Sequence, residues 1–171
     1  LGGAEDQFQF ASQPMTGDGV IIARFVPQMS AALSTVGVIM RESSAPASPC
    51  AALLIAPQNR RNSEKAGYLA RLQTRASAGA AAVVAAESPR FGEPYSEEGR
   101  MLGYCWLRLS RAGNTFTASY SPDGQSWTQL PEISLPLKPA LLAGLAASST
   151  DPRITTTVMF DNVTMAALPT R

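Results

Sequence analysis

The clearest alternation of apolar and polar residues runs from Tyr104 to Trp127. Two alternating runs flank the pair Gly113-Asn114, which is typical of tight hairpin turns because such residues supply positive φ angles. Closing the hairpin there pairs Ala112 with Thr115, Arg111 with Phe116, Leu109 with Ala118 and Leu107 with Tyr120. Successive side chains of a strand point to opposite faces, so one face is predicted to be core. That face holds Leu107, Leu109, Phe116, Ala118 and Tyr120, whereas Trp106, Arg108, Ser110, Thr117 and Ser119 share the other.

Short apolar runs recur along the rest of the chain and predict further strands. They cover residues 8–10, 20–26, 35–43, 51–56, 67–74, 141–147 and 155–165, with turns at 16–19 and 121–124. The stretch 76–86 is ambiguous: alanine favours helix, but a strand interrupted by Gly79 suits the surrounding pattern better. Residues 88–103 are rich in proline, glycine and glutamate, which predicts a long loop. Long loops in compact domains are often functional.

About ten to twelve short strands without a convincing helix indicate an all-β fold, a two-sheet antiparallel β-sandwich or jelly roll. In the second strand, Ile21, Ala23 and Phe25 are predicted to face inward. In the third, Gly37, Ile39 and Arg41 are predicted to share one face and Val36, Val38 and Met40 the other.

The length of 171 residues suits one domain over 1–171, with a core at about 6–166 and a tail at 167–171. Because the chain begins at Leu1 without a methionine, we expect a processed chain or one module of a longer one. No stretch approaches the roughly 20 apolar residues of a membrane span. A net charge of +1 provides no field that would favour nucleic acid.

The chain has no histidine, which removes His-dependent triads and most zinc sites. Its two cysteines, Cys50 and Cys105, both lie in apolar runs, and Cys105 alternates in phase with Leu107. Two separate buried thiols are one interpretation. A disulfide between Cys50 and Cys105 is the other and would fit an exported protein. We expect no metal site and no cofactor.

The segments TGDGVIIARF, GVIMRES, YCWLRLSRAGNTFTASYSPDGQSWTQL and MFDNVTM together resemble a known family. It is the concanavalin A-like, laminin-G-like jelly-roll domains of bacterial exported proteins, in particular members of unassigned function. The resemblance covers residues 8–165 and is weakest over 76–103. It implies two packed sheets, one with a concave face that receives sugar in lectin and glucanase relatives. It also implies an extracellular, periplasmic or cell-surface location.

The resemblance also suggests candidate binding residues. The family's outward-facing residues are matched by Arg24, Arg41, Trp106 and Arg108. Arg75 resembles the arginine that ends the family's middle strand, and Asp161-Asn162 resembles the motif of its last strand. Ser119 adds a hydroxyl group near Arg108. A pyranose can stack on an aromatic ring, and its hydroxyls can pair with forked guanidinium donors. The alternative for each arginine is an ion pair with a nearby acid. For Trp127 the alternative is packing after the turn. For Asp161-Asn162 we expect that the pair satisfies backbone donors at a β-bulge rather than binding calcium.

The sequence offers no catalytic residues. Related glucanases carry their carboxylates in an E-x-D-x-E strand, which is absent, and Glu97 and Glu98 are adjacent in a loop. The only lysines available as a base are Lys65 and Lys138. Two non-catalytic hypotheses remain ahead of a glycoside hydrolase. The first is a carbohydrate-binding module that uses the concave sheet face, with Trp106 exposed in a concavity and unpaired arginine donors around it. The second is a structural or protein-interaction domain, with Trp106 covered and its arginines paired to acids.

Overall fold

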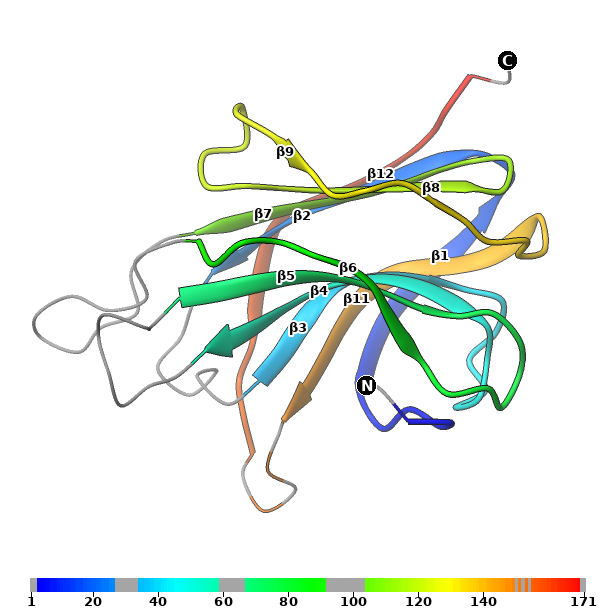
Figure 1. Cartoon of the computed structure of the whole chain (residues 1–171), viewed down its shortest axis with the longest axis horizontal. Helices are drawn as coiled ribbons and strands as arrows, with labels where there is room; N and C mark the ends of the chain where they lie inside the picture. The colour runs from blue at the N-terminus through cyan, green and yellow to red at the C-terminus, as the bar shows by residue number, and fades with distance from the viewer. Residues whose placement is uncertain are drawn as a thin grey trace, which may run out of the picture.

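Two antiparallel β-sheets of six strands each pack face to face in the computed structural model (Figure 1). The structure describes residues 3–26, 34–58, 67–91, 104–149, 151, 153 and 155–169, and these residues contain no helix. The first sheet contains, in spatial order, β1 (Gln9–Thr16), β11 (Ala140–Ser149), β3 (Ser34–Arg41), β4 (Cys50–Gln58), β5 (Gly67–Arg75) and β6 (Val83–Glu87). The second contains β10 (Ile133–Ser134), β8 (Thr115–Ser121), β7 (Cys105–Ala112), β2 (Gly19–Val26) and β12 (Met159–Ala167), with β9 (Thr128–Gln129) also paired to β8. The predicted all-β sandwich is confirmed.

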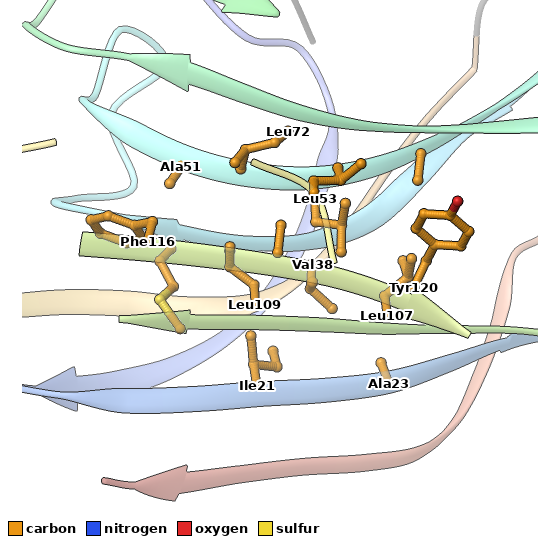
Figure 2. Close-up of a cluster of buried hydrophobic side chains, with 14 of the residues drawn as sticks. Ile21, Ala23, Val38, Ala51, Leu53, Leu72, Leu107, Leu109, Phe116 and Tyr120 are labelled. Atoms are coloured by element: carbon orange, nitrogen blue, oxygen red, sulfur yellow. The ribbon is translucent and has the colours of Figure 1, made fainter. Parts of the chain in front are cut away.

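The core lies between the two sheets and is built from the inward side of each strand. Figure 2 shows Ile21 and Leu109 of the second sheet facing Val38 and Leu53 of the first. All four side chains are fully buried. Burying a large aliphatic side chain stabilises the fold by roughly 1.5–3 kcal/mol, so this shared face is what holds the two layers together.

The hairpin of β7 and β8 has the predicted register, with Leu109 opposite Ala118 and Leu107 opposite Tyr120. Gly113 has a φ of 60° and Asn114 does not have a positive φ. This is the pattern of a type II′ turn, which requires glycine at its first central position. Local turn chemistry therefore sets the register that directs Trp106 and Arg108 away from the core.

Several element boundaries differ from the predictions. The first strand is longer than 8–10 because it pairs along β11, from Gln9 opposite Ala147 to Thr16 opposite Ala140. Residues 76–82 form a loop in which Gly79 has a φ of 76°, and only β6 is a strand in the ambiguous stretch. The last strand begins at Met159, later than predicted, and β9 and β10 were not predicted. Most of the predicted long loop, residues 92–103 with Glu97 and Glu98, lies outside the described residues. Lys65 lies outside them as well.

The two cysteines are free, and they lie in different layers. Cys105 belongs to the core between the sheets, whereas Cys50 belongs to a second apolar cluster on the outer face of the first sheet. Burial raises the pKa of both thiols. The disulfide hypothesis is therefore wrong for this structure, because sheet backbone separates the two side chains. In the part of the chain that the structure describes, no helix is long and apolar enough to span a membrane.

Candidate functional site

The outward side chains of the second sheet form two rows across β12, β2, β7 and β8. In one row, Asp161 is opposite Arg24, Arg24 is opposite Trp106, and Trp106 is opposite Ser121. In the next row, Ile22 is opposite Arg108, which in turn is opposite Ser119. Directly opposite residues in an antiparallel pair share a face. The strand order thus brings Arg24, Trp106 and Arg108 together.

Arg24 is fixed by a carboxylate on one strand and by aromatic rings on another. Its Nε donates to Asp161 Oδ1 at 2.6 Å, and its Nη2 donates to Oδ2 of the same carboxylate. Its guanidinium carbon lies 4.4 Å from the ring centroid of Tyr104 and 5.7 Å from that of Trp106. The hydrogen bonds from Arg24 lower the pKa of Asp161, and the same pair raises the pKa of Arg24. Arg24 is consequently a charged, stacked group with a set orientation.

The carboxylate reaches Arg24 from an irregular position in β12. The register shifts between Asp161 and Thr164, and Asn162 has a φ of 48°. Asparagine tolerates this left-handed conformation better than most residues do. This register shift agrees with the predicted β-bulge, but the main partner of the Asp161 carboxylate is the Arg24 side chain and not the expected backbone donors. The consequence of the bulge is that Asp161 points across to Arg24 and accepts a further hydrogen bond of 3.2 Å from the Asn162 amide.

The turn after β8 packs against one part of Trp106. Gly124 has a φ of 76°, and a Cβ built there would lie 2.8 Å from Trp106 Cε2. Asp123 organises the turn by accepting hydrogen bonds from the backbone N–H groups of Gln125 and Ser126 at 2.8 and 2.7 Å, which hold its pKa well below the ordinary value. Trp106 is therefore half-buried, supported by the turn rather than sealed by it.

Arg108 stacks on the other tryptophan. Its guanidinium carbon lies 4.4 Å from the Trp127 ring centroid, and Nη2 approaches Ser119 Oγ at 3.5 Å. Ser119 is fully buried, so its hydroxyl supports Arg108 and does not face solvent. This corrects the expectation that Ser119 contributes to a binding face. Trp127, for which packing after the turn was the alternative, is half-buried and belongs to this cluster.

We call these five residues, Arg24, Tyr104, Trp106, Arg108 and Trp127, the aromatic–arginine surface. Tyr104 was missed as a candidate, and its side chain is 53% exposed. The signal was present in the sequence, because Tyr104 has the same parity as Trp106 and Arg108 in the alternating run.

Arg41 and Arg75, the remaining candidates, do not join this surface. Both lie on the outer face of the first sheet, opposite Cys50 in register, and both are buried. Arg75 Nη1 and Nη2 donate to the two Asp6 oxygens at 2.7 and 2.8 Å, and Arg41 Nη2 lies 3.8 Å from Asp6 Oδ2. Further donors bind carbonyls of nearby loops, including Ser48 O at 3.1 Å. The N-terminal segment covers these two arginines, so they serve packing.

The chemistry available at the aromatic–arginine surface is that of binding. It offers apolar ring faces beside N–H donors, and its carboxylate Asp161 is committed to Arg24. Among the described residues, no group of three or more His, Cys, Asp or Glu side chains could hold a metal ion.

A hollow of about 250 Å³ lies away from this surface, at the open seam between β1 and β12. Its lining is mainly apolar, with Ala11, Leu145 and Phe160 among the contributing residues. It contains neither a charged side chain nor a residue of the aromatic–arginine surface. Pro14 on β1 and the bulge on β12 make both edges poor partners for an added strand.

No protein-family model and no curated protein sequence matches the chain. Solved structures do match its fold. The carbohydrate-binding module CBM66 from Bacillus subtilis aligns with a TM-score of 0.60 at 14% identity, covering 95% of this chain and 83% of the other. Lectin I-B4 from Griffonia simplicifolia aligns with a TM-score of 0.54 at 12% identity, covering 94% and 79%.

An enzyme shares the fold as well. The xylan β-1,4-xylosidase from Bacillus halodurans aligns with a TM-score of 0.67 at 11% identity, covering 96% of this chain but 32% of the enzyme. At such identities the likeness concerns the fold alone. The chain has the lectin-like β-sandwich fold, which carbohydrate-binding proteins and an enzyme both use.

Proposed function

We propose that the chain is a non-catalytic carbohydrate-binding module of an extracellular or cell-surface protein, and that sugar binds on the aromatic–arginine surface. The observation that carries this proposal is the gathering of three aromatic rings and two guanidinium groups on one face of the second sheet. The lectin and CBM66 folds support it as analogies.

The chemistry of the surface suits a pyranose ring. One side of a pyranose is lined by C–H groups and stacks on an aromatic ring, while its hydroxyls pair with forked donors. Tyr104, directly before β7, presents an exposed ring, and Arg108 presents N–H donors further along the same face of the sheet. Because the arginines are held by Asp161 and Trp127, little side-chain freedom is lost when a ligand binds.

The alternative is a structural or protein-interaction domain. Two observations favour it: Arg24 is paired with Asp161, and the Gly124 turn covers part of Trp106. Arg108 favours the carbohydrate-binding module instead, because it forms no ion pair with a described residue. We prefer the carbohydrate-binding module on that basis.

The chain has two tryptophans, and both belong to the proposed surface, so intrinsic fluorescence reports on it directly. We expect at least one glycan of a panel of neutral and acidic oligosaccharides to shift the emission on titration. Tyr104→Ala should weaken binding by roughly tenfold, or about 1.4 kcal/mol, while leaving the fold intact because the side chain is exposed. Gln73→Ala, on the other sheet, is the control and should bind like wild type. A panel without any response would reject the proposal.

A further inference from the structure

The arginines of the chain differ in how their charge is compensated. Of the arginines that the structure describes, five form ion pairs, namely Arg24, Arg41, Arg71, Arg75 and Arg153. Arg111 instead donates to the carbonyls of Gly113, Lys138 and Leu137 at 2.6–2.7 Å. Arg108 has neither arrangement: among the described residues its one hydrogen bond is to Ser119 at 3.5 Å. Arg90 also forms no ion pair with a described residue, but it is exposed to water, whereas Arg108 is half-buried.

The carboxylates of the second sheet's outer side are already committed elsewhere. Asp161 accepts from Arg24 and Asn162. Asp123 accepts from the backbone of its own turn, and Glu132 accepts from Thr117 and Gln129 at 3.4 Å each. None of these acids lies within 4.0 Å of Arg108. Among the described residues, therefore, no carboxylate compensates the positive charge of Arg108, which lies on the middle strand of the sheet.

The position of Arg108 also restricts how it can bind. The guanidinium carbon of Arg108 lies over the Trp127 ring, 4.4 Å from its centroid, so the indole covers one side of the group. The N–H edges then remain for a ligand, and these edges match the two oxygens of a carboxylate. The preceding outward residue of β7 is Trp106, so a sugar ring that contacts Trp106 would place its substituents near Arg108.

We propose that the ligand is an acidic saccharide containing uronic acid residues, and that Arg108 binds its carboxylate. This inference rests on the proposed carbohydrate-binding function and adds the ligand class and the residue that selects it. The carboxylate supplies the negative charge that the described part of the protein does not provide to Arg108. When a neutral sugar binds, its atoms would exclude water from the Arg108 guanidinium without supplying a compensating negative charge.

The test compares oligosaccharides of galacturonate, glucuronate and mannuronate with their methyl esters, which have the same rings without the charge. We expect wild-type protein to bind at least one free acid about ten- to a hundredfold more tightly than its ester, the range of one charge-assisted hydrogen-bonded pair. Arg108→Gln should remove this preference while retaining the weak binding of the ester. Arg108→Lys should retain part of it, since lysine keeps the charge but loses the fork. Arg71→Gln, on the other sheet, is the control for general electrostatic attraction and should bind like wild type.

The outcomes separate this inference from the function on which it rests. Equal binding of acids and esters, or an acid preference that survives in Arg108→Gln, would overturn the role of Arg108 and leave carbohydrate binding standing. Absence of binding by every acid, ester and neutral glycan would overturn both. Thermal unfolding of each variant shows whether a loss of binding reflects a loss of fold.

Discussion

Asp6 is a buried charged residue on which two buried arginines depend. Its carboxylate, on the N-terminal segment, accepts from Arg75 and lies near Arg41, and all three side chains are at most 2% exposed. A buried ion pair adds little net stability, because removing both charges from water costs about as much as their attraction returns. Removing one partner is costly, because it leaves the other charge uncompensated in a low-dielectric environment.

We predict that Asp6→Ala lowers the free energy of unfolding by about 3–5 kcal/mol, because it strands two buried guanidinium groups. Urea unfolding followed by tryptophan fluorescence measures this. The matched control is Glu87→Ala, which breaks the ion pair with Arg71. Both side chains of that pair are more than a third exposed. That change should cost about 1 kcal/mol or less. Similar losses for the two variants would show that the Asp6 cluster is not buried as described.

At the scale of elements, the bulge in β12 connects backbone geometry to the charge of the aromatic–arginine surface. Arg24 lowers the pKa of Asp161 from its ordinary value of 3.8. A carboxyl group whose pKa is depressed on folding stabilises the protein at pH values above the unfolded pKa, and this contribution is lost as pH falls through the folded value.

Wild type should therefore exceed Asp161→Asn in melting temperature near neutral pH, and the difference should shrink towards zero as pH falls below about 4. Differential scanning calorimetry of the two proteins between about pH 7 and pH 2.5 measures the effect. Other acids, Asp123 included, titrate in both proteins and so cancel in the comparison. A difference that does not change with pH would contradict an ionic contact at Asp161.

The turn after β8 offers a second prediction at this scale. Gly124→Ala should destabilise the protein more than Gly79→Ala does and should also shift tryptophan emission. Both glycines have a φ of 76°, but a Cβ at Gly124 meets the Trp106 ring at 2.8 Å, whereas a Cβ at Gly79 meets nothing within 4 Å. Gly79→Ala thus measures the backbone cost alone, about 1–2 kcal/mol. Equal effects at the two sites would mean that the turn does not pack on Trp106.

Elements encoded by neighbouring residues were predictable from the sequence. The β7–β8 register follows from Gly113 and from strict alternation, and the turn at 121–124 follows from its Asp-Gly pair. Strand order was not predictable, because pairings such as β2 with β7 join residues far apart in the chain. Arg24 and Arg41 occupy similar outward positions in alternating runs, and only the topology assigns them to different sheets. For the same reason the sequence could not indicate that Asp6 covers Arg41 and Arg75.

For the whole molecule, the two outer faces have different characters. The first sheet is covered at one end by the N-terminal segment, where Asp6 binds the arginines and Phe8 and Phe10 pack against an apolar cluster that includes Leu54. The second sheet displays the aromatic–arginine surface. We therefore propose that the outer face of the second sheet binds ligand and that the outer face of the first serves packing, a division that fold similarity alone does not provide.

The most direct test of this division is an amide chemical-shift map recorded while an oligosaccharide selected from the binding panel is titrated into the labelled protein. We predict that the largest shifts cluster on one face, at Arg24, at Tyr104 to Arg108 and at Gly124 to Trp127. Shifts concentrated on the outer face of the first sheet, around Gln73 and Ala52, or at the seam between β1 and β12, would contradict the account.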